Sequence, residues 1–227
     1  MIYLLILLGL SLLYWLFMSP TSQFFGKFPS KISTKDKTIY LTFDDGPNEP
    51  YTSQIIEYLN SKNIKATFFI VGECAKKYPK IIKKMYDSGH SIGNHTKSHK
   101  FFNYIKTPSM KKEIQDDQSI IKKITGEEPK LFRPPWLFRN PILLKSVKKL
   151  GLKPISGVFC HSLEVFQIDA QQIAKAAIKK AKPGQIIIFH DGYNAKGANR
   201  TQTVEAVKQT VEELTKKGFV FDKIPTH

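Results

Sequence analysis

The stretch Thr38–Pro47, TIYLTFDDGP, joins an apolar run directly to two adjacent carboxylates and a Gly-Pro turn. The apolar run has the β-branched and aromatic composition of a buried strand. Asp44 and Asp45 end this run. Adjacent carboxylates repel each other, and burying either one unpaired is costly. Something must therefore neutralise the two charges at the point where the strand ends.

Along the rest of the chain, apolar segments of strand type alternate with segments of helical periodicity. After Thr38–Asp44, the predicted strands are Ala66–Val71, His90–Asn94, Leu131–Phe132, Pro154–Phe159, Gln185–His190 and Phe219–Phe221. The predicted helices are Thr52–Asn60, Pro79–Ser88, Thr107 towards Gly126, Asn140–Leu150, Asp169–Ala181 and Thr201–Lys217. This alternation predicts an α/β fold with a mainly parallel sheet. Such folds place their chemistry at the carboxyl ends of the strands.

The chain has 227 residues, enough for one sizeable domain, and its formal net charge is +16. This excess favours an anionic partner, such as nucleic acid, a membrane surface or an acidic polymer. The basic residues are scattered as pairs on predicted helices, without zinc-finger spacing, an RNA-binding signature or a dense basic tail. We therefore expect no nucleic-acid partner. Cys74 and Cys160 form no C-x-x-C motif and indicate no disulfide framework.

Residues 1–18, MIYLLILLGLSLLYWLFM, form an uncharged apolar run of about the minimum length for a membrane-spanning helix. The run lacks a basic leader and a clear cleavage site. An uncleaved single-pass anchor is therefore expected rather than a signal peptide or a buried core helix. Residues 19–37 are polar and predict a linker, and residues 38–227 predict one folded domain. The lysines after the apolar run favour a cytoplasmic domain, but the side of the membrane stays open.

His95 and His99, in GNHTKSHK, are four residues apart. This spacing can bring two imidazoles to one side of a helical turn, where they can share a metal ion. Thr96 stands where the zincin motif requires glutamate, which excludes that class of protease. If Asp45 joins the two histidines, the three side chains form a facial set that leaves coordination positions open for water and substrate.

Further polar residues that follow predicted strands suit acid–base chemistry. A cation on Asp45 would offset the charge of that carboxylate and leave Asp44 free to take a proton from a metal-bound water. Arg133, in FRPPW, can hold Asp44 ionised and oriented. His190 ends the apolar strand QIIIFH and suits a general acid. Taken alone, a histidine in that position is more often an ordinary core residue.

The motifs TFDDGP, H-T-x-S-H, R-P-P-W and a late apolar strand ending in HDG occur in this order. Together they resemble the polysaccharide deacetylase family, the NodB-homology domain of carbohydrate esterase family 4. The resemblance covers about Thr38 to Phe221. It implies a distorted (β/α)7-type barrel. Together with the apolar run of residues 1–18, the expected fold is therefore an α/β barrel of this type with an N-terminal transmembrane anchor helix. The resemblance also implies a metal-dependent hydrolase in which a metal-bound water attacks an acetamide carbonyl and releases acetate from an amino sugar.

The resemblance also implies a role for each motif residue. Asp44 would be the catalytic base and Arg133 the residue that pairs with it. Trp136 would donate its backbone N–H to the oxyanion, and His190 would be the catalytic acid. The metal ligands would be one carboxylate and two imidazoles: Asp45, His95 and His99. In this family such a set usually holds zinc, and sometimes cobalt or nickel.

Two motifs depart from the family pattern. The fourth motif is typically Asp-Trp, in which the aspartate supports the arginine and the tryptophan lines the pocket of the acid. This chain has Glu164-Val165 instead. Glu164 can replace the charge with one more methylene, but Val165 cannot replace an indole. Leu137 stands where glycine commonly follows the third motif. His90 and His161 are expected to be ordinary residues, although His161 could reach the site.

The expected substrate is an N-acetylated glycan or glycolipid: peptidoglycan, a poly-N-acetylglucosamine exopolysaccharide or a polyprenyl-phosphate sugar. Extracytoplasmic polymers are the commonest substrates in the family, whereas the lysines after the apolar run suit a glycolipid on the cytoplasmic face. The alternative function is that of a non-catalytic carbohydrate-binding relative. The altered fourth motif favours this alternative slightly, and the complete set of catalytic residues argues against it.

Overall fold

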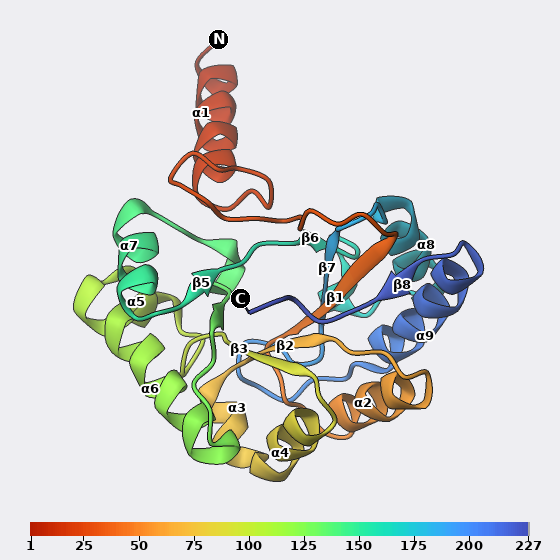
Figure 1. Ribbon diagram of the computed structural model, residues 1–227. Helices are drawn as coiled ribbons and strands as arrows, with labels where there is room; N and C mark the ends of the chain where they lie inside the picture. Colours follow the sequence, from red (N-terminus) through yellow and green to blue (C-terminus); the bar gives the residue numbers. More distant parts are fainter. Residues whose placement is uncertain (227) are drawn as a thin grey trace.

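The computed structural model describes residues 1–226, in which a curled sheet is surrounded by helices (Figure 1). Seven strands lie in the order β5-β4-β3-β2-β1-β7-β6, and β8 pairs with the beginning of β1. The pairings between these strands are all parallel. The strands are β1 Thr38–Asp44, β2 Thr67–Ile70, β3 Ser91–Asn94, β4 Leu131–Phe132, β5 Lys153–Pro154, β6 Val158–Phe159, β7 Ile186–His190 and β8 Val220–Phe221.

Helices α2 to α9 lie around the outside of the sheet (Figure 1). The helices are α1 Ile2–Phe17, α2 Tyr51–Ser61, α3 Gly72–Lys77, α4 Pro79–Asp87, α5 Phe101–Ile105, α6 Thr107–Thr125, α7 Pro141–Lys149, α8 Ala170–Lys180 and α9 Thr201–Lys216, with 3-10 helices η1 Pro135–Leu137 and η2 Glu164–Phe166. Local signals set several helix ends. Asn140 and Asp169 cap α7 and α8 by accepting backbone N–H groups. Gly126, with a φ of 86°, ends α6 in the left-handed conformation.

Strand β1 is buried along its whole length, which accounts for its nearly continuous apolar sequence. Its side chains alternate between the two faces of the sheet. Ile39, Leu41 and Phe43 belong to the largest hydrophobic cluster, which also contains buried residues of the outer helices. Thr42 and Asp44 consequently face the inside of the curled sheet. The strand therefore places a carboxylate inside the sheet at its carboxyl end.

The curled sheet has two open edges. Among residues 1–226, no pairing joins β5 to β6, and the strand predicted over Pro154–Phe159 is divided between these two edges. The segment before β1 lies in this gap: the N–H of Ser156 donates to the carbonyl oxygen of Pro29, and that of Ile186 to Ser30. The expected distorted (β/α)7-type barrel is therefore corrected to a curled half-barrel of parallel strands, although strands and helices alternate along the chain as expected.

The segment between α1 and β1, residues 19–37, contains no helix and only one isolated bridge, between Lys31 and Gln185. Parts of this segment pack tightly against the sheet. Phe28 is completely buried in a small cluster with Leu137 and Ile188. These contacts hold the segment beside the loop that follows β4.

The apolar N-terminal run forms α1, which projects from the rest of the molecule and has no buried residue (Figure 1). Its 16 residues extend about 24 Å, which is short of a hydrocarbon layer of about 30 Å. The helix ends at Phe17, whose carbonyl oxygen accepts the N–H of Arg139. Among residues 1–226, no helix combines the length and the apolar character that a bilayer crossing requires. The expected single-pass anchor, with the membrane as its partner and location, is therefore wrong.

Candidate active site

Asp45, His95 and His99 meet at the carboxyl end of the sheet, where all three are buried. Oδ1 of Asp45 lies 3.2 Å from Nε2 of His95 and 3.1 Å from Nε2 of His99. In a tetrahedral zinc site with bonds of about 2.0–2.1 Å, two ligand atoms are about 3.3 Å apart. The spacing and the chemistry of these three donors therefore fit a divalent cation.

The two imidazoles converge through a loop, and not through the helical turn that their spacing suggested. Thr96 and His99 have positive φ angles of 68° and 53°. Side chains stabilise this backbone, since Asn94 Oδ1 accepts the N–H of Thr96 and Thr96 Oγ1 accepts the N–H of His99. Asp117 of α6 accepts the N–H of His95 at 3.1 Å. The loop geometry thus replaces the helical period in bringing the ligands together.

The hydrogen bonds around the three ligands prepare them for a cation. Nδ1 of His95 lies 2.7 Å from the carbonyl oxygen of Arg133, so it must be the donor, and Nε2 keeps a free lone pair. The backbone N–H of Asn194 donates to Oδ2 of Asp45 at 3.0 Å. Burial alone would raise the pKa of Asp45, but His99 and His95 hold that pKa well below its usual value. Asp45 therefore stays ionised.

Arg133 neutralises the second carboxylate of the pair, Asp44. Its Nη1 donates to Oδ1 of Asp44 and to the hydroxyl of Thr42, both at 2.7 Å. Its Nη2 donates to the carbonyl oxygen of Ser156 at 2.9 Å. Arg133 is completely buried, and because a guanidinium stays charged, it places a positive charge at the end of β1. One carboxylate is thus balanced by a side chain, and the other faces a site suited to a metal ion.

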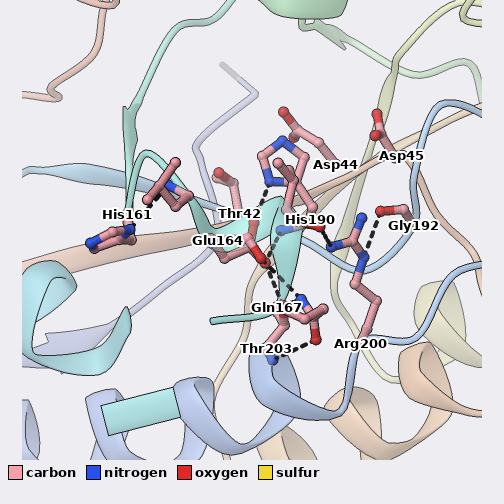
Figure 2. A network of polar contacts seen from close by, with 12 residues as sticks. Thr42, Asp44, Asp45, His161, Glu164, Gln167, His190, Gly192, Arg200 and Thr203 are labelled. Atoms are coloured by element: carbon pink, nitrogen blue, oxygen red, sulfur yellow. Dashed lines mark hydrogen bonds and ion pairs between the residues drawn. The ribbon is translucent and has the colours of Figure 1, made fainter. Parts of the chain in front are cut away.

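His190 ends β7 directly opposite Asp44 in the parallel register. Glu164 lies between His190 and Thr203 (Figure 2). The Nδ1–H of His190 donates to Oε2 of Glu164 at 2.7 Å, and the hydroxyl of Thr203 donates to Oε1. Burial alone would lower the pKa of His190, but the Glu164 carboxylate raises it to about 9. The imidazole is therefore protonated at neutral pH. The expectation that Glu164 supports Arg133 is wrong, because its partner is His190.

The predicted residues share one pocket of about 370 Å³. Six of the seven line it directly: Asp44, Asp45, His95, His99, Trp136 and His190. The seventh, Arg133, lies completely buried behind Asp44. The ring of Trp136 meets that of His99 edge-on, with the centroids 4.5 Å apart. Trp136 itself has a φ of 55°, which turns the backbone sharply at the edge of the pocket.

Both departures from the family motifs also line the pocket. Leu137 and Val165 lie in its wall, where they affect the space for a substrate and not the metal ligands. His161 lines the pocket as well, in agreement with the expectation that it could reach the site. His90 is a buried residue outside this pocket, and its Nδ1 accepts the N–H of Ala66.

Among the residues that support the site, sequence reasoning missed Thr42, Ser156, Asn194 and Thr203. Thr42 had a usable signal, because it precedes Asp44 by two residues in a strand and so shares its face. Ser156 and Asn194 contribute backbone groups, which any residue could supply. Thr203 follows its partner by 39 residues and begins no recognisable motif. Only the fold brings these three to the site.

Comparisons with known proteins agree with this geometry. A family model described as polysaccharide deacetylase matches residues 31–155. The chain is 32% identical over 192 residues to a peptidoglycan-N-acetylglucosamine deacetylase of Bacillus cereus, covering 84% of this chain and 88% of the relative. It is also 32% identical over 206 residues to a chitooligosaccharide deacetylase of Azorhizobium caulinodans, covering 86% of this chain and 97% of the relative. Among solved structures, it is similar to a family 4 acetyl xylan esterase from Clostridium thermocellum in complex with a cobalt ion. That match has a TM-score of 0.73 and 33% identity over 82% of this chain and 87% of the other.

Proposed function

Because this chain belongs to the polysaccharide deacetylase family, we propose that it removes N-acetyl groups from the amino sugars of a glycan such as peptidoglycan or a chitooligosaccharide. It is a metal-dependent hydrolase of the carbon–nitrogen bond of an acetamide. The observation that carries this proposal is the buried group of Asp45, His95 and His99 beside a separate carboxylate, Asp44. A family 4 relative acts on an acetyl ester, so the distinction between amide and ester is part of the test.

The metal ligands define the position of the reacting groups. Asp45, His95 and His99 would hold a divalent cation, which we propose to be zinc, with cobalt or nickel as substitutes. When bound, such a cation supplies Lewis-acid activation of a water molecule and of the carbonyl group. The protein keeps all three of these side chains buried at the floor of the pocket.

Asp44 and His190 move the protons of the reaction. Asp44 accepts a proton from the attacking water, while Arg133 donates to this carboxylate and holds it in place. The new carbon–oxygen bond forms as the carbonyl oxygen takes up negative charge. When the carbon–nitrogen bond breaks, Nε2–H of His190 donates its proton to the leaving nitrogen. The products are acetate and a free amino sugar.

The backbone N–H of Trp136 is the proposed donor to the oxygen that becomes negative. Trp136 lines the pocket beside His99. Its positive φ angle gives its peptide group a different orientation from a peptide group in a regular strand. A preorganised donor at this position stabilises the tetrahedral intermediate without reorganisation. The role depends on the backbone and not on the indole, so it would persist in variants that change only the ring.

The test is release of acetate and free amine from chitotetraose and from N-acetylated peptidoglycan, with and without a chelator. We expect release from at least one of these substrates, complete loss after chelation, and recovery when zinc or cobalt is returned. Acetylated xylan serves as the ester control. Release that is insensitive to the chelator, or release from the ester alone, would contradict the proposed amide hydrolysis by a metal-dependent site.

A non-catalytic carbohydrate-binding role is the second hypothesis, and Val165 in the pocket wall is the observation that favours it. The two buried acid–base pairs speak against it, since a binding module has no need of a carboxylate and an imidazolium held on either side of a metal site. Calorimetric binding of chitotetraose without any acetate release from the glycans above would support this second role.

A further inference from the structure

One wall of the catalytic pocket comes from outside the curled sheet. Tyr14, in the last turn of α1, lines the pocket together with Trp136, Phe159 and Tyr193. Its side chain is not enclosed, since α1 has no buried residue and Tyr14 is 53% exposed. A half-exposed aromatic ring at the mouth of a catalytic pocket is free to contact a ligand.

Arg139 fixes the end of α1 to this pocket. Its buried guanidinium donates to the carbonyl oxygens of Ser19 at 2.6 Å, Ser22 at 2.9 Å and Leu137 at 3.0 Å. Its backbone N–H donates to the carbonyl oxygen of Phe17 at 2.9 Å. The arginine therefore joins the residues after α1 to the loop after β4. The position of the helix end is determined by the same loop that lines the catalytic pocket.

Aromatic packing sets the face that α1 turns towards the pocket. The ring of Phe17 stacks on that of Phe138 with the centroids 5.8 Å apart. Tyr14 precedes Phe17 by three residues and so lies on the same side of the helix. Phe138 follows Trp136 by two residues in the loop. These contacts of Phe17 therefore hold the side of α1 that carries Tyr14 towards the pocket.

We propose that Tyr14 packs against a sugar ring next to the unit that loses its acetyl group, and thereby favours glycan chains over single sugars. This inference rests on the proposed function. A pyranose ring has an apolar face of C–H groups, and an amphipathic tyrosine covers such a face while its hydroxyl stays in water. The charged groups on the pocket floor take the acetamide, and the ring at the mouth takes the adjoining sugar.

The experiment compares three variants with chitotetraose as the probe, using the full chain loaded with zinc. Tyr14→Ala should raise the KM and the calorimetric Kd about three- to tenfold while kcat is unchanged. Tyr14→Phe should restore the affinity of the wild type, because the ring is kept. Tyr3→Ala is the matched control on the same helix: Tyr3 is 79% exposed and lies outside the pocket, so this change should have no effect.

Two results would overturn the inference: an unchanged KM in Tyr14→Ala, or an equal rise in Tyr3→Ala. Failure of the proposed function looks different, because the wild type itself would then release no acetate. In that case the calorimetric comparison still decides the role of Tyr14. Weaker binding of chitotetraose by Tyr14→Ala would support the contact, and equal or absent binding by the wild type and the variant would overturn it.

Discussion

The two sides of the pocket are built from buried ion pairs of opposite design. On one side a carboxylate, Asp44, lines the pocket, and a guanidinium, Arg133, lies behind it at 2.7 Å. On the other side an imidazole, His190, lines the pocket, and a carboxylate, Glu164, lies behind it at 2.7 Å. Asp44 and His190 lie opposite each other at the carboxyl ends of the adjacent strands β1 and β7.

Arg133, behind Asp44, and Glu164, behind His190, differ in how firmly they hold the side chain in front of them and in its exposure to solvent. Arg133 carries a permanent charge and donates to Asp44, Thr42 and Ser156, so the carboxylate of the proposed base is held in one orientation. Glu164 lies in the short helix η2, and the side chain of His190 is 14% exposed. The proposed acid must regain a proton from water in each cycle, and its side chain is more exposed than that of Asp44, which is 5% exposed.

Replacing the carboxylate of Asp44, the proposed base, should have the largest effect on turnover. Asp44→Asn keeps the shape of the side chain but cannot accept a proton, so kcat should fall by about 10²–10⁴. Bound zinc, measured by atomic emission after dialysis, should stay at the level of the wild type. The matched control is Asp45→Asn, which should lose the metal as well as turnover. Normal turnover in Asp44→Asn would show that Asp44 is not the base.

Removing the fixed charge should destabilise the fold. Arg133→Met leaves the buried carboxyl group of Asp44 without its guanidinium partner, which should lower the free energy of unfolding by about 3–5 kcal/mol. Urea denaturation followed by circular dichroism measures this loss. The double variant Arg133→Met, Asp44→Asn removes the unpaired charge and should recover part of the stability. If the double variant is no more stable than Arg133→Met, the loss arises from packing and not from the charge.

The acid side should respond to pH. The pKa of His190 is raised to about 9, so its proton, and the activity, should be lost as the pH rises through that value. In Glu164→Gln the main cause of the raised pKa is gone, so the alkaline limb of kcat should move towards the ordinary histidine value of 6.5. A pH profile on chitotetraose measures the shift. Arg133→Lys is the control, because it keeps the charge on the base side and should leave the alkaline limb in place.

The sequence was sufficient for those parts of the site that depend on neighbouring residues. Asp44 and Asp45 were located because two charges interrupt an apolar strand, and the strand then aims them to the carboxyl end of the sheet. His95 and His99 were paired by their spacing, although a loop with two positive φ angles brings them together instead of a helical turn. Short-range sequence patterns therefore predict which side chains come together better than they predict the backbone conformation that brings them together.

Long-range contacts account for what the sequence did not predict. The partner of Glu164 depends on where η2 meets the end of β7, and no local pattern distinguishes His190 from Arg133 as that partner. The apolar run of residues 1–18 gave no sign that the carbonyl oxygen of Phe17, at the end of the helix, would accept the N–H of Arg139. The opening of the sheet likewise depends on Ser156 pairing with Pro29, far away along the chain.

The smallest expected effect lies behind the acid, where Thr203 donates its hydroxyl to Glu164. Thr203→Val removes one hydrogen bond to a charged group and should lower the free energy of unfolding by about 1.5–3 kcal/mol. The alkaline limb of the pH profile should stay closer to that of the wild type than to that of Glu164→Gln, since the carboxylate itself remains.

Thr210 is a matched control on α9: it is also completely buried, but its hydroxyl has no partner within residues 1–226. Thr210→Val should therefore cost no stability and leave the pH profile unchanged. Equal losses in the two variants would mean that the hydroxyl of Thr203 contributes nothing to the acid side, and that Glu164 is held by His190 alone.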